Sequence, residues 1–386
     1  MVKNLSTSLI KILLTTAAIF WSALPAYAIV TNSQLKNTQD LMKLVEKNKP
    51  AVNSAYSYDF FSPYLSWGLD PEDKKSSINI KEVWQNFKKK KEIVVAVIDT
   101  GIDPSHPFIK DNITVIEGNF NSSDNYGVDF SKDHKFRSRP EDSHGHGTHV
   151  AGIIRSVFPE VKILSLKYYN PTASGQDNLN STIEALRYAV EKGVDVINYS
   201  GGGPEPSTEE LKALKMAADK GILVVAAAGN EESDIDNKKN AYYPASYGLS
   251  NIITVTAHDQ SMAMLSASNW GKKSVDISAP GQRIRSSLPS GRSGYLTGTS
   301  QATAFVSGVA AMIKSQYPEI SATVLKQIIV DSANKESILT TKCASGGRLD
   351  ASSAYSLARK MYDKSDVKRD VAGQKGEIKQ QASSRK

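Results

Sequence analysis

Gly298-Thr299-Ser300-Gln301-Ala302 opens the stretch that organises this 386-residue chain. Small and apolar residues follow it from Thr303 to Ile313, and no charge appears until Lys314. Such a run predicts a buried helix with Ser300 in its first turn. Because the first backbone N–H groups of a helix are unpaired and favour negative charge, a serine there can act as a nucleophile; it can equally be an N-cap.

Strand patterns alternate with helix patterns over most of the chain. Continuous apolar runs predict buried strands at 93–98, 161–166, 194–199, 222–228 and 252–257. Helical spacing is found at 150–157, 179–192, 207–220 and 321–333. In the third of these, Ser207 and Glu210 have the spacing of a capping box. The alternation predicts an α/β fold with a mostly parallel sheet.

The N-terminus has the pattern of a secretory signal peptide. Lys3 and Lys11 are followed by an apolar segment, 12–24, that ends in Pro25-Ala26-Tyr27-Ala28. The alternative is a membrane anchor, but the segment is shorter than the ~20 residues needed to span a bilayer. We therefore expect cleavage after Ala28 and a secreted protein, extracellular or periplasmic.

The rest of the chain divides into three parts by composition. We expect a short N-terminal segment at 29–64, one domain at 65–358 and a basic, disordered tail at 359–386. Without Lys3 and Lys11 the formal charge of +7 becomes +5. The excess lies largely in the tail and in a lysine run at 88–91 that is typical of a solvated turn, so nucleic acid is not an expected partner. Cys343 is the only cysteine, which excludes an intramolecular disulfide.

Three polar residues stand where a parallel sheet forms its sites, near the carboxyl ends of strands. Asp99 ends the first strand, although it could simply cap the next turn. His144, His146 and His149 cluster before and in a helix rich in small residues. They could bind a metal, but no H-E-x-x-H pattern or nearby cysteine supports one, so a general base is preferred. Ser300 would need such a base to lose its proton.

Four motifs in this order resemble those of the subtilisin family of serine endopeptidases. They are Val-Ala-Val-Ile-Asp-Thr-Gly around Asp99, His-Gly-Thr-His-Val-Ala-Gly from His146, Val-Val-Ala-Ala-Ala-Gly-Asn ending at Asn230, and Gly-Thr-Ser-x-Ala around Ser300. The resemblance covers about 65–358. It implies a three-layer α/β fold, with helices on both faces of the sheet, and a protease that forms an acyl-enzyme.

The resemblance also implies a role for each matched residue. Ser300 would be the nucleophile, His146 the general base and then acid, and Asp99 the group that orients the imidazole. The Asn230 side chain would hold the oxyanion together with the Ser300 N–H. Two segments would line the primary specificity pocket and pair with an extended polypeptide substrate. Their residues are Ser200, Gly201 and Gly202, and Ala227, Ala228 and Gly229.

The chain departs from the family pattern at several points. Gln301 stands where methionine usually follows the nucleophile, and Tyr242 stands where a glycine usually forms the base of the pocket, which a phenol would narrow. A processing protease for basic sites would need acidic side chains at the pocket, and only Glu205 lies nearby. We therefore expect general or small-residue specificity.

Two further departures concern calcium and the propeptide. The segment 155–161 is too short for the calcium loop that bacterial subtilisins carry there, so structural calcium would need a weaker site, such as the acidic 124–142 loop. The 29–64 segment is shorter than the usual propeptide, which implies a truncated or absent one. No cofactor is required for the chemistry, and a monomer is expected. The alternative function is a binding or regulatory protein that keeps the fold without turnover.

Overall fold

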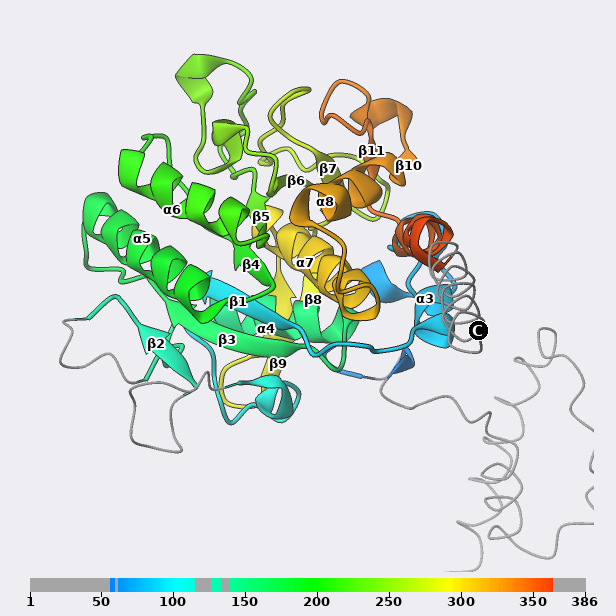
Figure 1. The fold of residues 1–386 in the computed structure, drawn as a ribbon, viewed down its shortest axis with the longest axis horizontal. Helices are drawn as coiled ribbons and strands as arrows, with labels where there is room; N and C mark the ends of the chain where they lie inside the picture. The colour runs from blue at the N-terminus through cyan, green and yellow to red at the C-terminus, as the bar shows by residue number, and fades with distance from the viewer. Residues whose placement is uncertain (1–55, 60–61, 115–125, 133–138, 364–386) are drawn as a thin grey trace, which may run out of the picture. The chain divides into compact units, whose positions relative to one another are not determined.

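The computed structural model describes residues 56–59, 62–114, 126–132 and 139–363, which all fall in one compact unit of the chain (Figure 1). The expected signal peptide, most of the 29–64 segment, much of the acidic loop and the tail after 363 lie outside the described residues.

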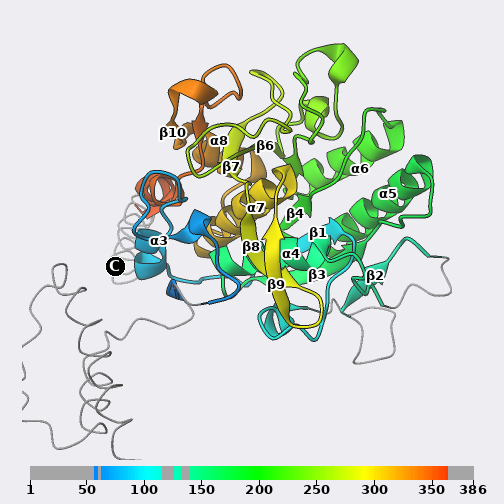
Figure 2. The same cartoon turned by 180° about the vertical axis from the view of Figure 1, so that it is seen from behind.

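Within the described residues, one large sheet has the strand order β10-β11-β7-β6-β5-β4-β1-β3-β2. Its neighbouring strands are parallel except for β10 and β11. The strands are β1 (Val94–Asp99), β2 (Gly127–Asp129), β3 (Lys162–Lys167), β4 (Val196–Tyr199), β5 (Leu223–Ala227), β6 (Ile252–His258), β7 (Ile277–Pro280), β10 (Asn334–Lys335) and β11 (Gly347–Arg348). A separate antiparallel hairpin, β8 (Ile284–Leu288) and β9 (Arg292–Leu296), lies beside α4 (Figure 2).

Helices cover both faces of this sheet. They are α3 (Lys81–Asn86), α4 (His146–Val157), α5 (Gly175–Lys192), α6 (Thr208–Asp219), α7 (Thr299–Gln316) and α8 (Ala322–Asp331), with a further helical stretch at 351–363. The short 3-10 helices are η2 (Trp67–Leu69), η3 (Lys110–Asn112), η5 (Lys238–Asn240), η6 (Ala245–Tyr247) and η7 (Ser337–Leu339).

The alternation of side chains along β1 shows how the layers are held together. Val95 and Val97 belong to the core that contains α4, α7 and α8, whereas Ala96 and Ile98 belong to the core that contains α5 and α6. The helices α5 and α6 lie side by side on that second face (Figure 1). The predicted three-layer α/β fold with a mostly parallel sheet is confirmed.

Two helices begin earlier than their apolar patterns predicted. The helix predicted at 150–157 starts at His146, and the one predicted at 179–192 starts at Gly175. In α5 the first turn is polar, and it is stabilised by the Ser174 side chain, which accepts a hydrogen bond from Asp177 N. His146 therefore belongs to the first turn of α4 rather than preceding the helix.

The domain extends beyond both boundaries expected from composition. Tyr56 is buried in the main core, donates to Glu160 and packs near Phe87, so the end of the segment 29–64 belongs to this unit. At the other end, the helix from 351 continues to 363, and the Tyr317 hydroxyl donates to Asp363 (2.9 Å). Residues just outside the expected boundaries at 65 and 358, namely Tyr56 and Asp363, therefore contact the domain.

Candidate active site

Asp99 and His146 meet where the end of β1 faces the start of α4. The Nδ1–H of His146 donates to Asp99 Oδ1 at 2.7 Å, and Asp99 is buried. With Nδ1 protonated, Nε2 is left to accept a proton. Gly147 permits this approach, since a Cβ there would lie 2.1 Å from the Gly101 carbonyl oxygen. The structure therefore fixes the orientation of the imidazole of His146, the candidate base.

A second buried carboxylate, that of Asp142, accepts hydrogen bonds from residues at the start of α4. Its Oδ1 accepts from Thr100 Oγ1 (2.9 Å), His144 N (3.0 Å) and Gly145 N (2.7 Å). Its Oδ2 accepts from the Thr148 backbone N (2.9 Å) and Oγ1 (2.6 Å). The sequence analysis gave this aspartate no role, although an aspartate shortly before a helix start is a typical cap.

The histidines of the cluster differ sharply in environment. Burial lowers the pKa of His146, but the charge and the hydrogen bond of Asp99, with a contribution from Asp142, raise it above the usual value. His149 is fully buried, bonds the Ile284 carbonyl oxygen through Nε2 (2.9 Å) and has a pKa lowered by burial to about 4. His144 is exposed. Of these three, the one that faces Asp99 is His146.

Ser300 lies in the first turn of α7, as the sequence predicted, and is buried. Its hydroxyl donates to the backbone oxygen of Ser200 at 3.1 Å. Among the described residues no hydrogen bond joins it to His146. The nucleophile candidate is therefore held by the loop that follows β4, not by the base candidate.

Asn230 follows β5 and is exposed. Its side-chain oxygen accepts from the Thr299 backbone N (3.0 Å) and Oγ1 (3.3 Å). Because these donors fix the amide with its oxygen toward α7, the NH₂ group is left to face the other way. The Ser300 N–H belongs to the first turn of α7, where backbone donors have no partner within the helix. The two donors could together bind an oxyanion.

The predicted substrate-binding segments lie next to each other, because β4 and β5 are neighbours and Tyr199 pairs with Ala226. One segment, Ser200 to Gly202, follows β4, and the other, Ala227 to Gly229, ends β5. Tyr242 fills the space between them. A Cβ on Gly202 would lie 2.4 Å from its Cε1, and a Cβ on Gly229 would lie 3.1 Å from its Cδ2.

The region expected to lack a calcium loop is compact. Only residues 158–161 join α4 to β3, and their one carboxylate, Glu160, accepts from Tyr56 and lies 3.6 Å from Lys89. Among the described residues, no group of three or more His, Cys, Asp or Glu side chains could hold a metal ion. Nor does the described part of the chain contain a helix with the length and apolar character to span a membrane.

Residues 90–355 match the Subtilase family. The major intracellular serine protease of Bacillus subtilis (strain 168) is 38% identical over 252 residues, which cover 63% of this chain and 74% of the relative. The intracellular serine protease of Paenibacillus polymyxa is 36% identical over 65% of this chain and 78% of its own length. Subtilisin DY of Bacillus licheniformis is 36% identical over 62% of this chain and 83% of its own length.

These matches, together with the parallel sheet and the polar groups at its edge, define the chain as a serine endopeptidase. It belongs to the subtilisin family. The names of the relatives include both intracellular proteases and subtilisins, so they do not decide the compartment.

Proposed function

We propose that this endopeptidase cleaves polypeptides with Ser300 as nucleophile, His146 as base and then acid, and Asp99 as the orienting carboxylate. The observation that carries the proposal is the 2.7 Å hydrogen bond between Asp99 and His146, formed where a buried strand end meets a helix start. It holds the imidazole in the tautomer whose Nε2 can take the serine proton.

The proposed reaction needs only these protein groups and water. As Ser300 Oγ attacks the scissile carbonyl carbon, its proton passes to His146 Nε2. The oxyanion is bound by Asn230 Nδ2 and the Ser300 N–H. The protonated imidazole then gives its proton to the leaving amine, and the acyl-enzyme remains. Water repeats the sequence with His146 again as base, releasing the carboxylic acid and restoring Ser300.

A non-catalytic binding protein with the same fold is the alternative. It would not require the Asp99–His146 hydrogen bond, the orientation of the Asn230 amide and a serine at the start of α7 all together. Turnover separates the two proposals. The wild-type protein should hydrolyse denatured casein, and Ser300→Ala should not, although both fold to the same melting temperature. Equal residual hydrolysis by both proteins would favour the alternative.

We further propose that the enzyme accepts small side chains at P1, the residue whose carbonyl is attacked. Tyr242 supports this, because its ring lies against both walls of the primary pocket. Tyr242→Gly should raise kcat/KM for P1 phenylalanine by about tenfold or more relative to P1 alanine. The reason is that the enlarged pocket can bury the apolar ring of the phenylalanine. Tyr243→Phe, which changes the neighbouring tyrosine, is the control. An unchanged ratio in Tyr242→Gly would contradict the proposal.

We propose export from the signal-peptide pattern of residues 1–28 and from the absence of another apolar stretch long enough to span a membrane in the sequence. Mass spectrometry of the N-terminus after expression in a bacterium tests it. A mature chain that starts at Ile29 supports export, and an intact Met1 in the cytosol contradicts it.

A further inference from the structure

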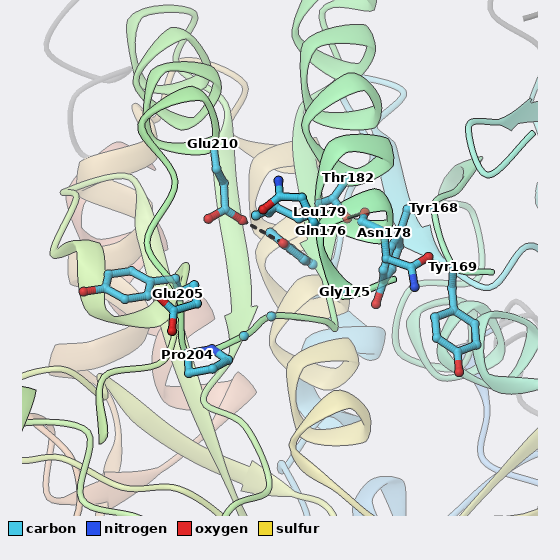
Figure 3. A pocket seen from close by; sticks show the side chains of 14 residues that line it. Tyr168, Tyr169, Gly175, Gln176, Asn178, Leu179, Thr182, Pro204, Glu205 and Glu210 are labelled. Atoms are coloured by element: carbon cyan, nitrogen blue, oxygen red, sulfur yellow. Dashed lines mark hydrogen bonds between the residues drawn. The ribbon is translucent and has the colours of Figure 1, made fainter. Parts of the chain in front are cut away.

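A pocket of about 400 Å³ lies next to the substrate-binding loop (Figure 3). One wall comes from the end of β3 and the first turns of α5, and the other from the loop after β4 and from Glu210 on α6. Gly202 belongs both to this lining and to the predicted substrate-binding segment. The pocket therefore continues the substrate path along that segment.

The lining is acidic. Glu205 and Glu210 contribute carboxylates, and no lysine, arginine or histidine lines the pocket. Glu210 is buried, whereas Glu205 is exposed on the loop. Any charged side chain that enters the pocket therefore meets negative charge and no competing cation.

Glu210 does not complete the capping box that its spacing predicted. Ser207 Oγ accepts from the Glu210 N–H (3.3 Å), but the Glu210 carboxylate turns inward instead of back to Ser207. It accepts from the Tyr199 hydroxyl (2.7 Å) and the Tyr247 hydroxyl (2.8 Å). Both partners are neutral, and no ion pair joins Glu210 to a cation within the part of the chain that the structure describes. The carboxylate therefore keeps acceptor sites.

Aromatic rings supply the rest of the recognition surface. Tyr168, Tyr169, Tyr199 and Tyr243 line the pocket, and their rings and hydroxyl oxygens can contact a cation. The wall is held in place, because Gly203 and Tyr243 exchange backbone hydrogen bonds of 3.0 and 2.7 Å. A long aliphatic stem ending in a positive charge matches this combination of apolar walls and acidic end.

We propose that this pocket binds a lysine or arginine side chain of the substrate on the amino-terminal side of the scissile bond. The proposal rests on the proposed function, since it uses the substrate path of the same active site. Because Tyr242 fills the primary pocket, only a small P1 side chain fits there. The basic side chain then makes a larger contribution to substrate recognition than the P1 side chain does. The enzyme then selects sites by a cation upstream and a small residue at P1.

The test uses peptides with alanine at P1 and a single lysine moved through P2 to P5, each paired with a norleucine peptide that lacks only the charged nitrogen. We expect one position at which lysine raises kcat/KM about tenfold over norleucine. Glu205→Gln, Glu210→Gln and the double variant should reduce that ratio, with the double variant near one. Gln at 210 keeps an acceptor for the tyrosines, and thermal melting checks that it folds.

Glu209→Gln is the matched control, because Glu209 is exposed on α6, does not line the pocket and carries the same charge. It should leave the ratio unchanged. A ratio of one at every position in the wild type, or a preference that survives in the double variant, would overturn the proposal. In both cases Ser300-dependent cleavage of the norleucine peptides would continue. Loss of that cleavage would instead contradict the proposed function.

Discussion

The two helix starts at the proposed active site differ in how firmly their side chains are held by hydrogen bonds. At α4, Asp99 and Asp142 together fix the imidazole and the helix backbone through short hydrogen bonds. At α7, Ser300 donates to a loop oxygen at 3.1 Å. The Asn230 side chain accepts through its oxygen, and its NH₂ group has no hydrogen-bond partner among the described residues.

The difference indicates that folding alone orients the groups at α4, whereas substrate binding would complete the hydrogen bonds of the groups at α7. The proposed base, His146, is oriented by the fold itself, with two carboxylates near its imidazole. The proposed nucleophile and oxyanion donors would use their remaining hydrogen-bonding capacity to bind a substrate carbonyl. Each of the following variants changes one side chain that holds the start of α4 or of α7.

Asp99→Asn should have the largest effect among the supporting residues. The amide NH₂ group can donate to Nδ1 and so stabilise the tautomer that carries its proton on Nε2, which cannot accept the serine proton. We therefore expect kcat to fall by about 10⁴-fold, as in other serine proteases. Steady-state hydrolysis of a P1 alanine peptide measures it. A loss of less than about tenfold would show that the base does not depend on this hydrogen bond.

Asn230→Ala should reduce kcat by about 10²–10³-fold with little change in KM, the scale known for the oxyanion asparagine of subtilisin. The reason is that its NH₂ group would be used only once negative charge develops on the substrate oxygen. Asn230→Asp keeps the acceptor for Thr299 but adds a negative charge, and it should be at least as impaired. An effect confined to KM would contradict the assignment.

Asp142→Asn should have a smaller effect on the maximal rate and a distinct effect on pH dependence. Only neutral His146 can act as base, so activity is lost as pH falls through its raised pKa. Removing the Asp142 charge lowers that pKa and should move the acidic limb of kcat/KM to lower pH. Thr148→Val, which removes one hydrogen bond to Asp142 but no charge, should leave the limb in place. An unchanged limb in Asp142→Asn would mean that Asp142 acts only on helix position.

Much of the fold could be predicted from the sequence, because its central strands are continuous apolar runs. The strands the sequence missed lack that pattern. Strand β7 includes Pro280, β2 has only three residues, and the hairpin β8–β9 carries arginines and serines. The early starts of α4 and α5 were missed since their first turns are polar and are fixed by capping side chains rather than by an apolar face.

The candidate active site was predicted residue by residue from motifs, but its geometry was not. Spacing along the chain could not show that Asp142 accepts hydrogen bonds both from Thr100 and from Thr148. It also could not show that the Glu210 carboxylate points inward and accepts from Tyr199. Those features depend on contacts between elements far apart in sequence. The Tyr242 substitution was visible in the sequence, but only the structure places its ring against Gly202 and Gly229.

Labelling by a fluorophosphonate probe, followed by mass spectrometry of the modified peptide, tests the central claim most directly. The claim predicts stoichiometric labelling at Ser300 in the wild type, much slower labelling in Asp99→Asn and none in Ser300→Ala. Labelling that is absent from folded wild-type protein, or equally fast in Asp99→Asn, would contradict a nucleophile activated by the Asp99–His146 pair.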